Sequence, residues 1–381
     1  MILFCRFFVL DVSLYTYRAK KTASSSKSDN PFFVFLVVFY RCLWYYVEVE
    51  FSKERSRAVF PAAACRHMQN YTNEILRQVN QVILGKQDVV RKVLLAILAK
   101  GHVLLEDVPG VGKTTMAMAF AKTLGLSTGR VQFTSDTLPS DIIGFSVYDK
   151  RTGTLQYKPG AVMTNLLLAD EINRTSGKTQ SALLEAMEEQ QVTVDGVTHP
   201  LPVPFIVLAT QNPVGSAGTQ MLPASQMDRF LLRLNMGYPD LRSQVMLMQD
   251  RHHENPLDKC TPVTNAQALG EMCKAVAETY VSMEMYEYIA ALTQATREDG
   301  DVQLGLSPRG GLALCRAAKA NAFLHGRDYM LPDDVDEIFA SVCAHRLILG
   351  AKARLHEKTA EDVLERILSR VPHPPMEAFR I

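Results

Sequence analysis

Short apolar runs that end in polar residues recur along the middle of the chain, and segments with helical spacing separate them. The runs are Val103 to Glu106, Leu166 to Ala169 and 205–213, which reads FIVLATQNP. Such runs are typical of strands that are buried on both faces of a parallel sheet. Residues 116–124 have helical spacing and end at Gly125, a favourable helix C-cap. This alternation predicts an α/β fold with a parallel sheet.

Two helices are predicted in the C-terminal part of the chain. Residues 306–326 begin with Ser307 as N-cap and Pro308 at the first helical position. Residues 330–349 place Pro332 and two aspartates in a first turn, before an apolar stripe at helical spacing. Both patterns indicate a helical region after the α/β part.

The N-terminal segment, residues 1–67, has a different composition. Its ten Lys and Arg against five Asp and Glu give +5, so the remainder carries −4 of the total of +1. A membrane anchor, a signal sequence and translated upstream DNA are the alternatives. A spanning helix needs about 20 apolar residues, but Asp11 and Arg41 interrupt the apolar runs, and the basic n-region of a signal sequence is missing. We expect Met68 to be the true start and residues 1–67 to be a non-native or disordered extension.

Composition excludes few functions. The chain has 381 residues, 47% hydrophobic and 21% charged, which is ordinary for a globular protein with room for two domains. A net charge of +1 gives no sign of a nucleic-acid binder. The seven cysteines lack C-x-x-C spacing, which argues against a zinc site or a disulfide framework. We therefore expect a reducing, cytoplasmic setting.

The stretch LEDVPGVGKTT, residues 105–115, lies between a predicted strand and a predicted helix, as a phosphate-binding loop requires. Backbone N–H groups of such a loop surround phosphate oxygens, the lysine contacts the β- and γ-phosphates, and a hydroxyl binds Mg²⁺. Asp107 stands at the usual position of the first glycine, away from the phosphates. The residues expected to bind nucleotide here are Pro109, Gly110, Val111, Gly112, Lys113, Thr114 and Thr115.

Acidic and amide side chains follow two of the predicted strands, at the edge where ligands bind open α/β sheets. We expect Asp170 and Thr114 to hold Mg²⁺, and Glu171 to orient and deprotonate the attacking water. At the end of the strand 205–213, Asn212 is the candidate that contacts the γ-phosphate and the water.

Two arginines are further candidates. Arg229 precedes an apolar strand, where it is a surface charge, a partner of Asp228, or an arginine finger that contacts the γ-phosphate of a neighbouring subunit. Arg309 falls in the first turn of the helix 306–326, where the helix dipole disfavours a cation. That position suggests a nearby anion, and a γ-phosphate would be suitable.

Taken together, these motifs resemble those of AAA+ ATPases, and specifically of the MoxR family in the helix-2-insert clade. GVGKT is similar to Walker A, LLLADEINR to Walker B, ATQNP to sensor 1, LPASQMDRF to the arginine-finger segment and GLSPRG to sensor 2. Residues 135–162 resemble the β-structured helix-2 insert. Residues 191–204 resemble the pre-sensor 1 hairpin, with Asp195-Gly196 as its turn. Ala224 and Ser225 depart from the family pattern.

The resemblance implies an AAA+ αβα nucleotide-binding domain at 68–240, a linker at 241–254 and a smaller all-α lid domain at 255–381. Adenine would lie near Ile83, Leu84 and Gly85, between the domains. The implied cofactors are ATP and Mg²⁺. The implied assembly is a hexameric ring that acts on a protein partner, often one with a von Willebrand A domain.

The main functional hypothesis is an ATP-hydrolysing chaperone that remodels or matures a partner, with cofactor or metal insertion as one form of this work. The alternative is a slow nucleotide-dependent switch or assembly scaffold. A DNA-associated motor is disfavoured, because Lys150, Arg151 and Lys158 of the insert are balanced by three aspartates, Asp136, Asp141 and Asp149. No nucleic-acid partner is expected, and membrane association is expected only through a partner.

Overall fold

The computed structural model describes residues 62–106, 110–211, 222–250 and 256–375. The chain divides into two units, Met1–Ala58 and Val59–Ile381, and the described residues lie in the second. The apolar runs of residues 1–61 lie outside the described residues. Among the helices that are described, none is long and apolar enough to cross a membrane.

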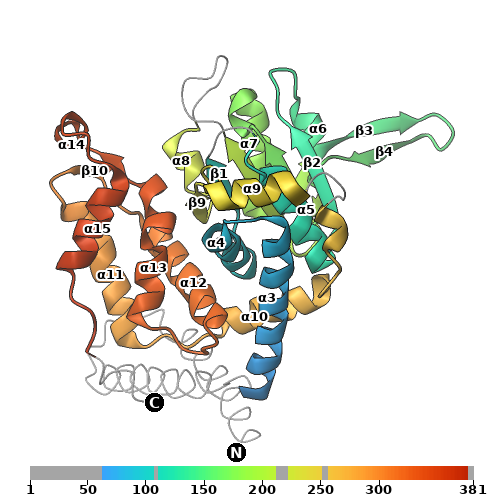
Figure 1. Cartoon of the computed structure of the whole chain (residues 1–381). Coiled ribbons are helices and arrows are strands. Elements are labelled where there is room, and N and C mark those ends of the chain that lie inside the picture. The colour runs from blue at the N-terminus through green and yellow to red at the C-terminus, as the bar shows by residue number, and fades with distance from the viewer. Residues whose placement is uncertain (1–61, 107–109, 212–221, 251–255, 376–381) are drawn as a thin grey trace, which may run out of the picture. The chain divides into compact units, whose positions relative to one another are not determined.

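A five-stranded parallel sheet forms the centre of the nucleotide-binding part (Figure 1). Its strand order is β2-β5-β8-β1-β9, and all neighbours are parallel. The strands are β1 (Val103–Glu106), β2 (Thr128–Gln132), β5 (Leu166–Asp170), β8 (Ile206–Gln211) and β9 (Leu232–Leu234). The predicted parallel sheet is therefore confirmed.

Each face of the sheet is covered by its own hydrophobic core, as the alternation of side chains along a strand requires. Leu166 and Leu168 belong to the core that includes helices α3 (Ala62–Val82), α4 (Gln87–Leu98) and α5 (Lys113–Leu124). Leu167 and Ala169 belong to the core on the other face, with α7 (Gly177–Glu189). The result is the predicted αβα arrangement.

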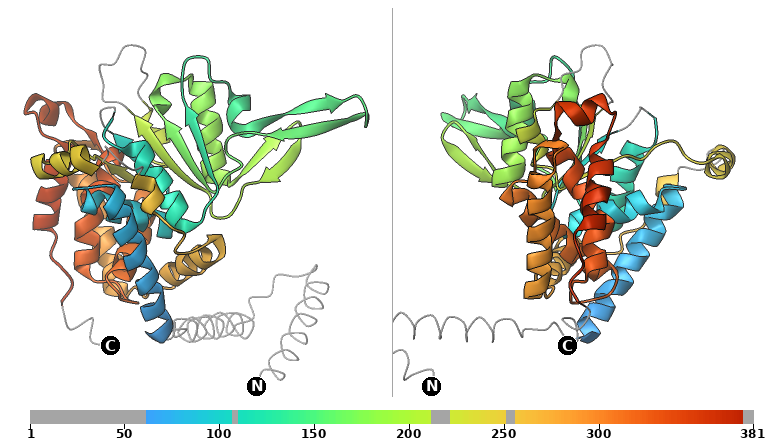
Figure 2. Two further views of the ribbon diagram at one scale, coloured as in Figure 1. Left: turned by 45° about the vertical axis from the view of Figure 1, so that its right-hand side comes forward. Right: turned by 90° about the vertical axis from the view of Figure 1, so that its left-hand side faces the viewer.

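Two hairpins leave the sheet region and lie beside each other (Figure 2). The first consists of β3 (Gly144–Asp149) and β4 (Thr154–Pro159), which follow the short helix α6 (Pro139–Ile143). The second consists of β6 (Gln191–Val194) and β7 (Val197–Pro200). Its turn has φ values of 49° at Asp195 and 79° at Gly196, as a type I′ turn needs. Tyr157 stacks on His199 with ring centroids 3.8 Å apart, which joins the hairpins.

The C-terminal part is mostly helical. Its longer helices are α10 (Ala266–Ala277), α11 (Met283–Glu298), α12 (Pro308–Leu324), α13 (Pro332–Cys343) and α15 (Ala360–Arg370). The shorter elements are α14 (Ala351–Leu355), η2 (Pro256–Lys259), η3 (Ala344–Arg346) and the antiparallel strands β10 (Val302–Leu304) and β11 (Ile348–Leu349). The Ser307 side chain accepts the Gly310 N–H at 3.2 Å, which confirms the predicted N-cap of α12.

Two short helices precede this part. The first, α8 (Ala224–Met227), leads into β9, and the second, α9 (Leu241–Asp250), begins the predicted linker. Helix α3 begins at Ala62 and runs across Met68, so the predicted start at Met68 falls inside a helix. The start at Met68 and the domain limits at 240 and 255 stay predictions.

Candidate active site

The phosphate-binding loop ends where α5 begins. Gly110 and Gly112 have φ values of 87° and 96°, in the left-handed region that favours glycine. A Cβ at either position would meet nothing within 4 Å. Glycine is therefore favoured there by the positive φ and not by a lack of space for a side chain. Lys113 is the first residue of α5 and is only 7% exposed. The first N–H groups and the dipole of α5 therefore favour an anion at Lys113.

The remaining loop residues are consistent with this position. Thr114 and Thr115 lie half-buried in the first turn of α5, and Val111 packs against the core of that face. Pro109 and Asp107 lie outside the described residues. The start of α5 thus combines two glycines in the left-handed region with a lysine and a hydroxyl. This set of groups fits a polyphosphate with its Mg²⁺.

The two acidic residues lie at the carboxyl end of β5, as the sequence predicts. Asp170 ends the strand, and its Oδ1 accepts the Thr210 hydroxyl of β8 at 2.7 Å. The same hydroxyl oxygen accepts the Glu171 backbone N–H at 2.9 Å. Arg130 of β2 donates to Asp170 Oδ2 at 2.9 Å. Side chains from the two neighbouring strands, β2 and β8, therefore orient Asp170, and oxygen ligands of this kind suit Mg²⁺.

Glu171 has an unusual backbone. Its φ of 57° and ψ of 48° place it in the left-handed region, which costs a non-glycine residue about 1–3 kcal/mol and is often found at functional sites. Its carboxylate accepts Gln132 Nε2 at 2.8 Å and Arg174 Nη1 at 2.9 Å, both on Oε2. These two polar contacts to Oε2 hold the side chain beside Asp170.

The predicted sensor, Asn212, lies outside the described residues. Its strand β8 ends at Gln211, which is 3% exposed and donates to Glu106 Oε1 at 2.9 Å. The amide at the end of β8 that the structure describes is therefore bound to the neighbouring strand.

The predicted adenine residues lie after α3. Ile83 is buried in the core, and Gly85 has a φ of 70°. A Cβ on Gly85 would come within 2.4 Å of Ser243 Oγ in α9, so this glycine permits a close approach of α9. A role for Ile83 and Gly85 in binding adenine stays a prediction.

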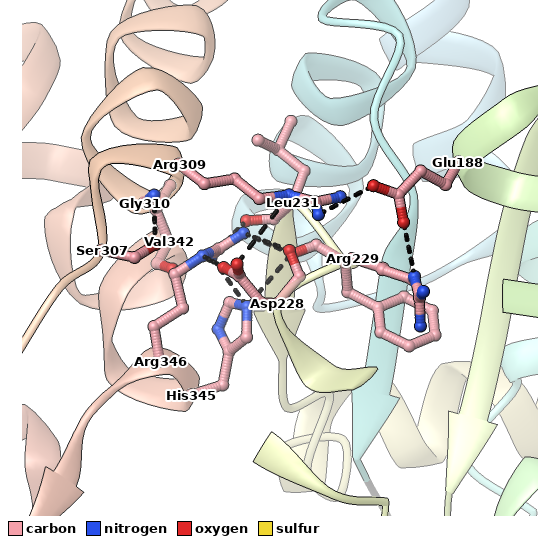
Figure 3. Close-up of polar contacts among 11 residues, drawn as sticks. Glu188, Asp228, Arg229, Leu231, Ser307, Arg309, Gly310, Val342, His345 and Arg346 are labelled. Atoms are coloured by element: carbon pink, nitrogen blue, oxygen red, sulfur yellow. Dashed lines mark hydrogen bonds and ion pairs between the residues drawn. The ribbon is translucent and has the colours of Figure 1, made fainter. Parts of the chain in front are cut away.

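Arg229 and Arg309 meet at one carboxylate (Figure 3). Arg229 Nε donates to Glu188 Oε2 at 2.8 Å, and Arg309 Nη1 donates to Glu188 Oε1 at 3.0 Å. Glu188 lies in the last turn of α7. Of the alternatives considered for Arg229, a pairing with Asp228 gives way to an ion pair with Glu188 of a different element. The anion that the position of Arg309 suggested is here a carboxylate of the chain itself.

Asp228 has two other partners. Arg346 Nε donates to Asp228 Oδ1 at 2.7 Å, and Arg309 Nε lies 3.8 Å from Asp228 Oδ2. The Arg346 side chain is only 4% exposed and also donates to backbone carbonyls of both parts of the structure. These carbonyls belong to Asp228, Phe230, Leu231 and Val342. We call the five residues Glu188, Asp228, Arg229, Arg309 and Arg346 the arginine cluster.

Charge and burial shift three pKa values around the arginine cluster. The hydrogen bond from Arg229, and then the charge of Arg309, lower the pKa of Glu188 against the opposing effect of burial. Burial lowers the pKa of the Arg346 guanidinium, but the ordinary pKa of arginine is so high that the group stays charged. Burial and the charge of Arg346 lower the pKa of His345, whose Nε2 lies 3.1 Å from the Phe230 carbonyl oxygen. His345 is therefore neutral at pH 7.

Sequence reasoning missed Glu188 and Arg346. Glu188 stands in LLEAMEEQ among three other acidic or amide residues, and Arg346 lies in a 3₁₀ turn without a motif. Sequence reasoning also missed the bridge that the Thr210 hydroxyl forms between Asp170 and the Glu171 backbone N–H.

Comparison with known proteins agrees with this geometry. The ATPase family associated with various cellular activities (AAA) matches residues 102–232, and the AAA lid domain matches residues 294–367. A crystal structure from Cytophaga hutchinsonii has a TM-score of 0.76 and 35% identity, covering 86% of this chain and 99% of that chain.

Full-length relatives refine the assignment. "Uncharacterized protein YeaC" from Bacillus subtilis is 47% identical, over 78% of this chain and 93% of its own length. "Chaperone MoxR1" from Mycobacterium tuberculosis is 38% identical, over 79% and 82%. "Protein MoxR" from Methylorubrum extorquens is 31% identical, over 78% and 94%. Fold, loop and matches together define an AAA+ ATPase, a P-loop enzyme that hydrolyses ATP. Within that class, the chain belongs to the MoxR family.

Proposed function

We propose that this protein is an ATP-driven chaperone that remodels or matures a protein partner, and that it works as a ring of its own copies. The names of the relatives support the chaperone role, since one is called "Chaperone MoxR1". A partner with a von Willebrand A domain, to which a cofactor or metal is added, is the expectation from the family resemblance. A six-membered ring and a cytoplasmic location have the same basis.

The observation that carries the proposal is the division of the charged groups into two sets. Lys113 begins the helix after the loop, and Asp170 and Glu171 lie at the end of β5. Arg229 and Arg309 instead bind the carboxylates of Glu188 and Asp228. In the proposed ring, one nucleotide site consists of the first set from one subunit and the two arginines from the next.

Each residue has a separate task in this proposal. Gly110, Gly112 and Lys113 bind the phosphates at the start of α5, while Glu171 orients a water and accepts its proton. Asn212 contacts that water and the γ-phosphate. Thr114 and Asp170 hold Mg²⁺, which neutralises phosphate charge when bound. Arg229 and Arg309 of the adjacent subunit stabilise the charge that develops on the transferred phosphoryl group.

A slow switch is the second candidate function, and two contacts of Glu171 favour it. Arg174 and Gln132 both donate to the Glu171 carboxylate, which must be available to activate water. In a switch these contacts keep turnover low until a partner binds. A steady ATPase rate that a protein partner does not change would contradict this second candidate.

The test is the ATPase rate per subunit as a function of protein concentration, for the wild type and for mixtures of two variants. A rate that rises and then saturates is expected if subunits complete one another's sites. Arg229→Ala alone should lower hydrolysis about 10³-fold. Mixing it with Glu171→Gln should recover part of the rate, because some interfaces then pair an intact Glu171 with an intact Arg229. No recovery at any mixing ratio would contradict the shared site.

A further inference from the structure

Glu188 joins the two candidate arginines, which come from different parts of the structure. Arg229 lies between α8 and β9 of the nucleotide-binding part, and Arg309 lies in the first turn of α12 in the helical part. Each binds a different oxygen of the Glu188 carboxylate, Oε2 at 2.8 Å and Oε1 at 3.0 Å. Figure 3 shows Glu188 between the two guanidinium groups. One carboxylate thus determines the distance between them.

The nitrogens that make these contacts decide what Glu188 can do. Arg229 binds Glu188 through Nε, which leaves its two terminal nitrogens outside this ion pair. Arg309 uses Nη1 for Glu188 and Nε for Asp228, so its Nη2 lies outside both contacts. A guanidinium has five N–H donors, so each arginine keeps donors for an incoming phosphate while it is bound. The geometry therefore orients the arginines without using all their donors.

Repulsion between cations explains why a carboxylate is needed. Burial, and after it the charges of Arg346 and Arg309, lower the pKa of Arg316, which also lies on α12. Burial also lowers the pKa of Arg346, and the charge of Arg309 adds to that effect. The arginine cluster contains three guanidiniums and two carboxylates, namely Glu188 and Asp228. Without Glu188, the ion pair that remains for Arg309 among the described residues is the longer contact to Asp228 at 3.8 Å. Arg229 would lose the ion pair through its Nε.

We propose that Glu188 is a positioning residue for ATP hydrolysis, which holds Arg229 and Arg309 together so that both reach the same phosphate group. The inference rests on the proposed function, because it assumes that both arginines contact the nucleotide of an adjacent subunit. Glu188 itself contacts neither ATP nor water in this account. It reduces the freedom that the two long side chains would lose when the subunits close on the nucleotide.

The test compares Glu188→Gln with Glu189→Gln. Glu189 is the exposed neighbour in the same last turn of α7, so its variant changes the charge equally but leaves the arginines bound. Glu188→Gln should lower kcat about tenfold, as a loss of orientation does, with the ATP affinity of Glu189→Gln and a free energy of unfolding lower only by the small contribution of the lost ion pairs. A KM that rises while kcat stays constant would contradict a positioning role.

A double-mutant cycle separates positioning from general damage. In an Arg229→Ala, Arg309→Ala background, Glu188→Gln should have almost no further effect on kcat, because the groups that it orients are gone. An equally large loss in both backgrounds would overturn the inference. A kcat above that of the wild type would also overturn it, since Glu188 would then hold the arginines away from the nucleotide.

The same experiment separates this inference from the proposed function. If Arg229→Ala and Arg309→Ala both retain the wild-type rate, the arginine roles themselves are wrong. If both variants lose activity while Glu188→Gln does not, the shared site stands and only the role of Glu188 fails.

Discussion

Two charged regions of the molecule are built in different ways and carry net charges of opposite sign. The first is the phosphate-binding loop together with the acids of β5, and the second is the arginine cluster. Lys113, Asp170 and Glu171 have their places because a helix begins or a strand ends at each of them. The arginine cluster instead joins side chains of α7, the segment between α8 and β9, α12 and η3.

The difference has a functional consequence. Backbone geometry and a parallel sheet hold the first set within one part of the structure, so it is preorganised for binding. Ion pairs hold the second set, and those of Arg309 and Arg346 connect the helical part to the nucleotide-binding part, so a shift of α12 or η3 changes them. The first set is suited to binding and water activation, and the second to sensing how the two parts lie relative to each other.

The largest effect is expected where the arginine cluster is most buried. Arg346→Ala removes the partner of Asp228 and the donor to four backbone carbonyls, and it should lower the free energy of unfolding by about 3 kcal/mol. Denaturant unfolding measures the change, with the exposed Arg354→Ala as control. ATP affinity of the folded variant should stay unchanged. A weaker affinity would mean that the two sets are not independent.

A smaller effect, confined to catalysis, is expected at the strand end. Glu171→Gln keeps the shape of the side chain but removes the base, so hydrolysis should fall about a hundredfold, close to 2.7 kcal/mol, with ATP still bound. Single-turnover hydrolysis and an ATP titration measure the two quantities. Lys113→Ala is the contrasting variant, because it should weaken ATP binding itself. Unchanged turnover in Glu171→Gln would remove Glu171 from the role of base.

The smallest effect concerns pH and the Glu188 ion pairs. Because Arg229 lowers the pKa of Glu188 in the folded protein, the stabilisation is present above the ordinary glutamate pKa of about 4.3 and is lost as the pH falls further. For this partly exposed group we expect about 0.5 kcal/mol. The stability difference between wild type and Glu188→Gln should be constant from pH 8 to about 5 and shrink below. A constant difference down to pH 3, or the same trend in Glu189→Gln, would contradict this explanation.

The accuracy of the sequence predictions followed the degree of burial. The predicted strand Val103 to Glu106 is β1, and Leu166 to Ala169 lies within β5, because central strands are apolar throughout. The edge strand β2, Thr128–Gln132, is different. Its residues alternate between exposed and half-buried, so its limits leave little trace in the hydrophobic pattern.

The sequence alone determined the class of this protein. Two local patterns indicate an ATPase. One is a pair of glycines with a lysine and a threonine at the start of a helix, and the other is two acidic residues after an apolar strand. Each pattern encodes local backbone geometry within a few residues. Tertiary structure decided the partners of the arginines. Glu188 lies 41 residues before Arg229 and 121 before Arg309. It is one of 40 acidic residues in the chain, each of which is a candidate partner for an arginine when the sequence alone is considered. Ion pairs over such separations depend on how whole helices pack, which no local pattern specifies.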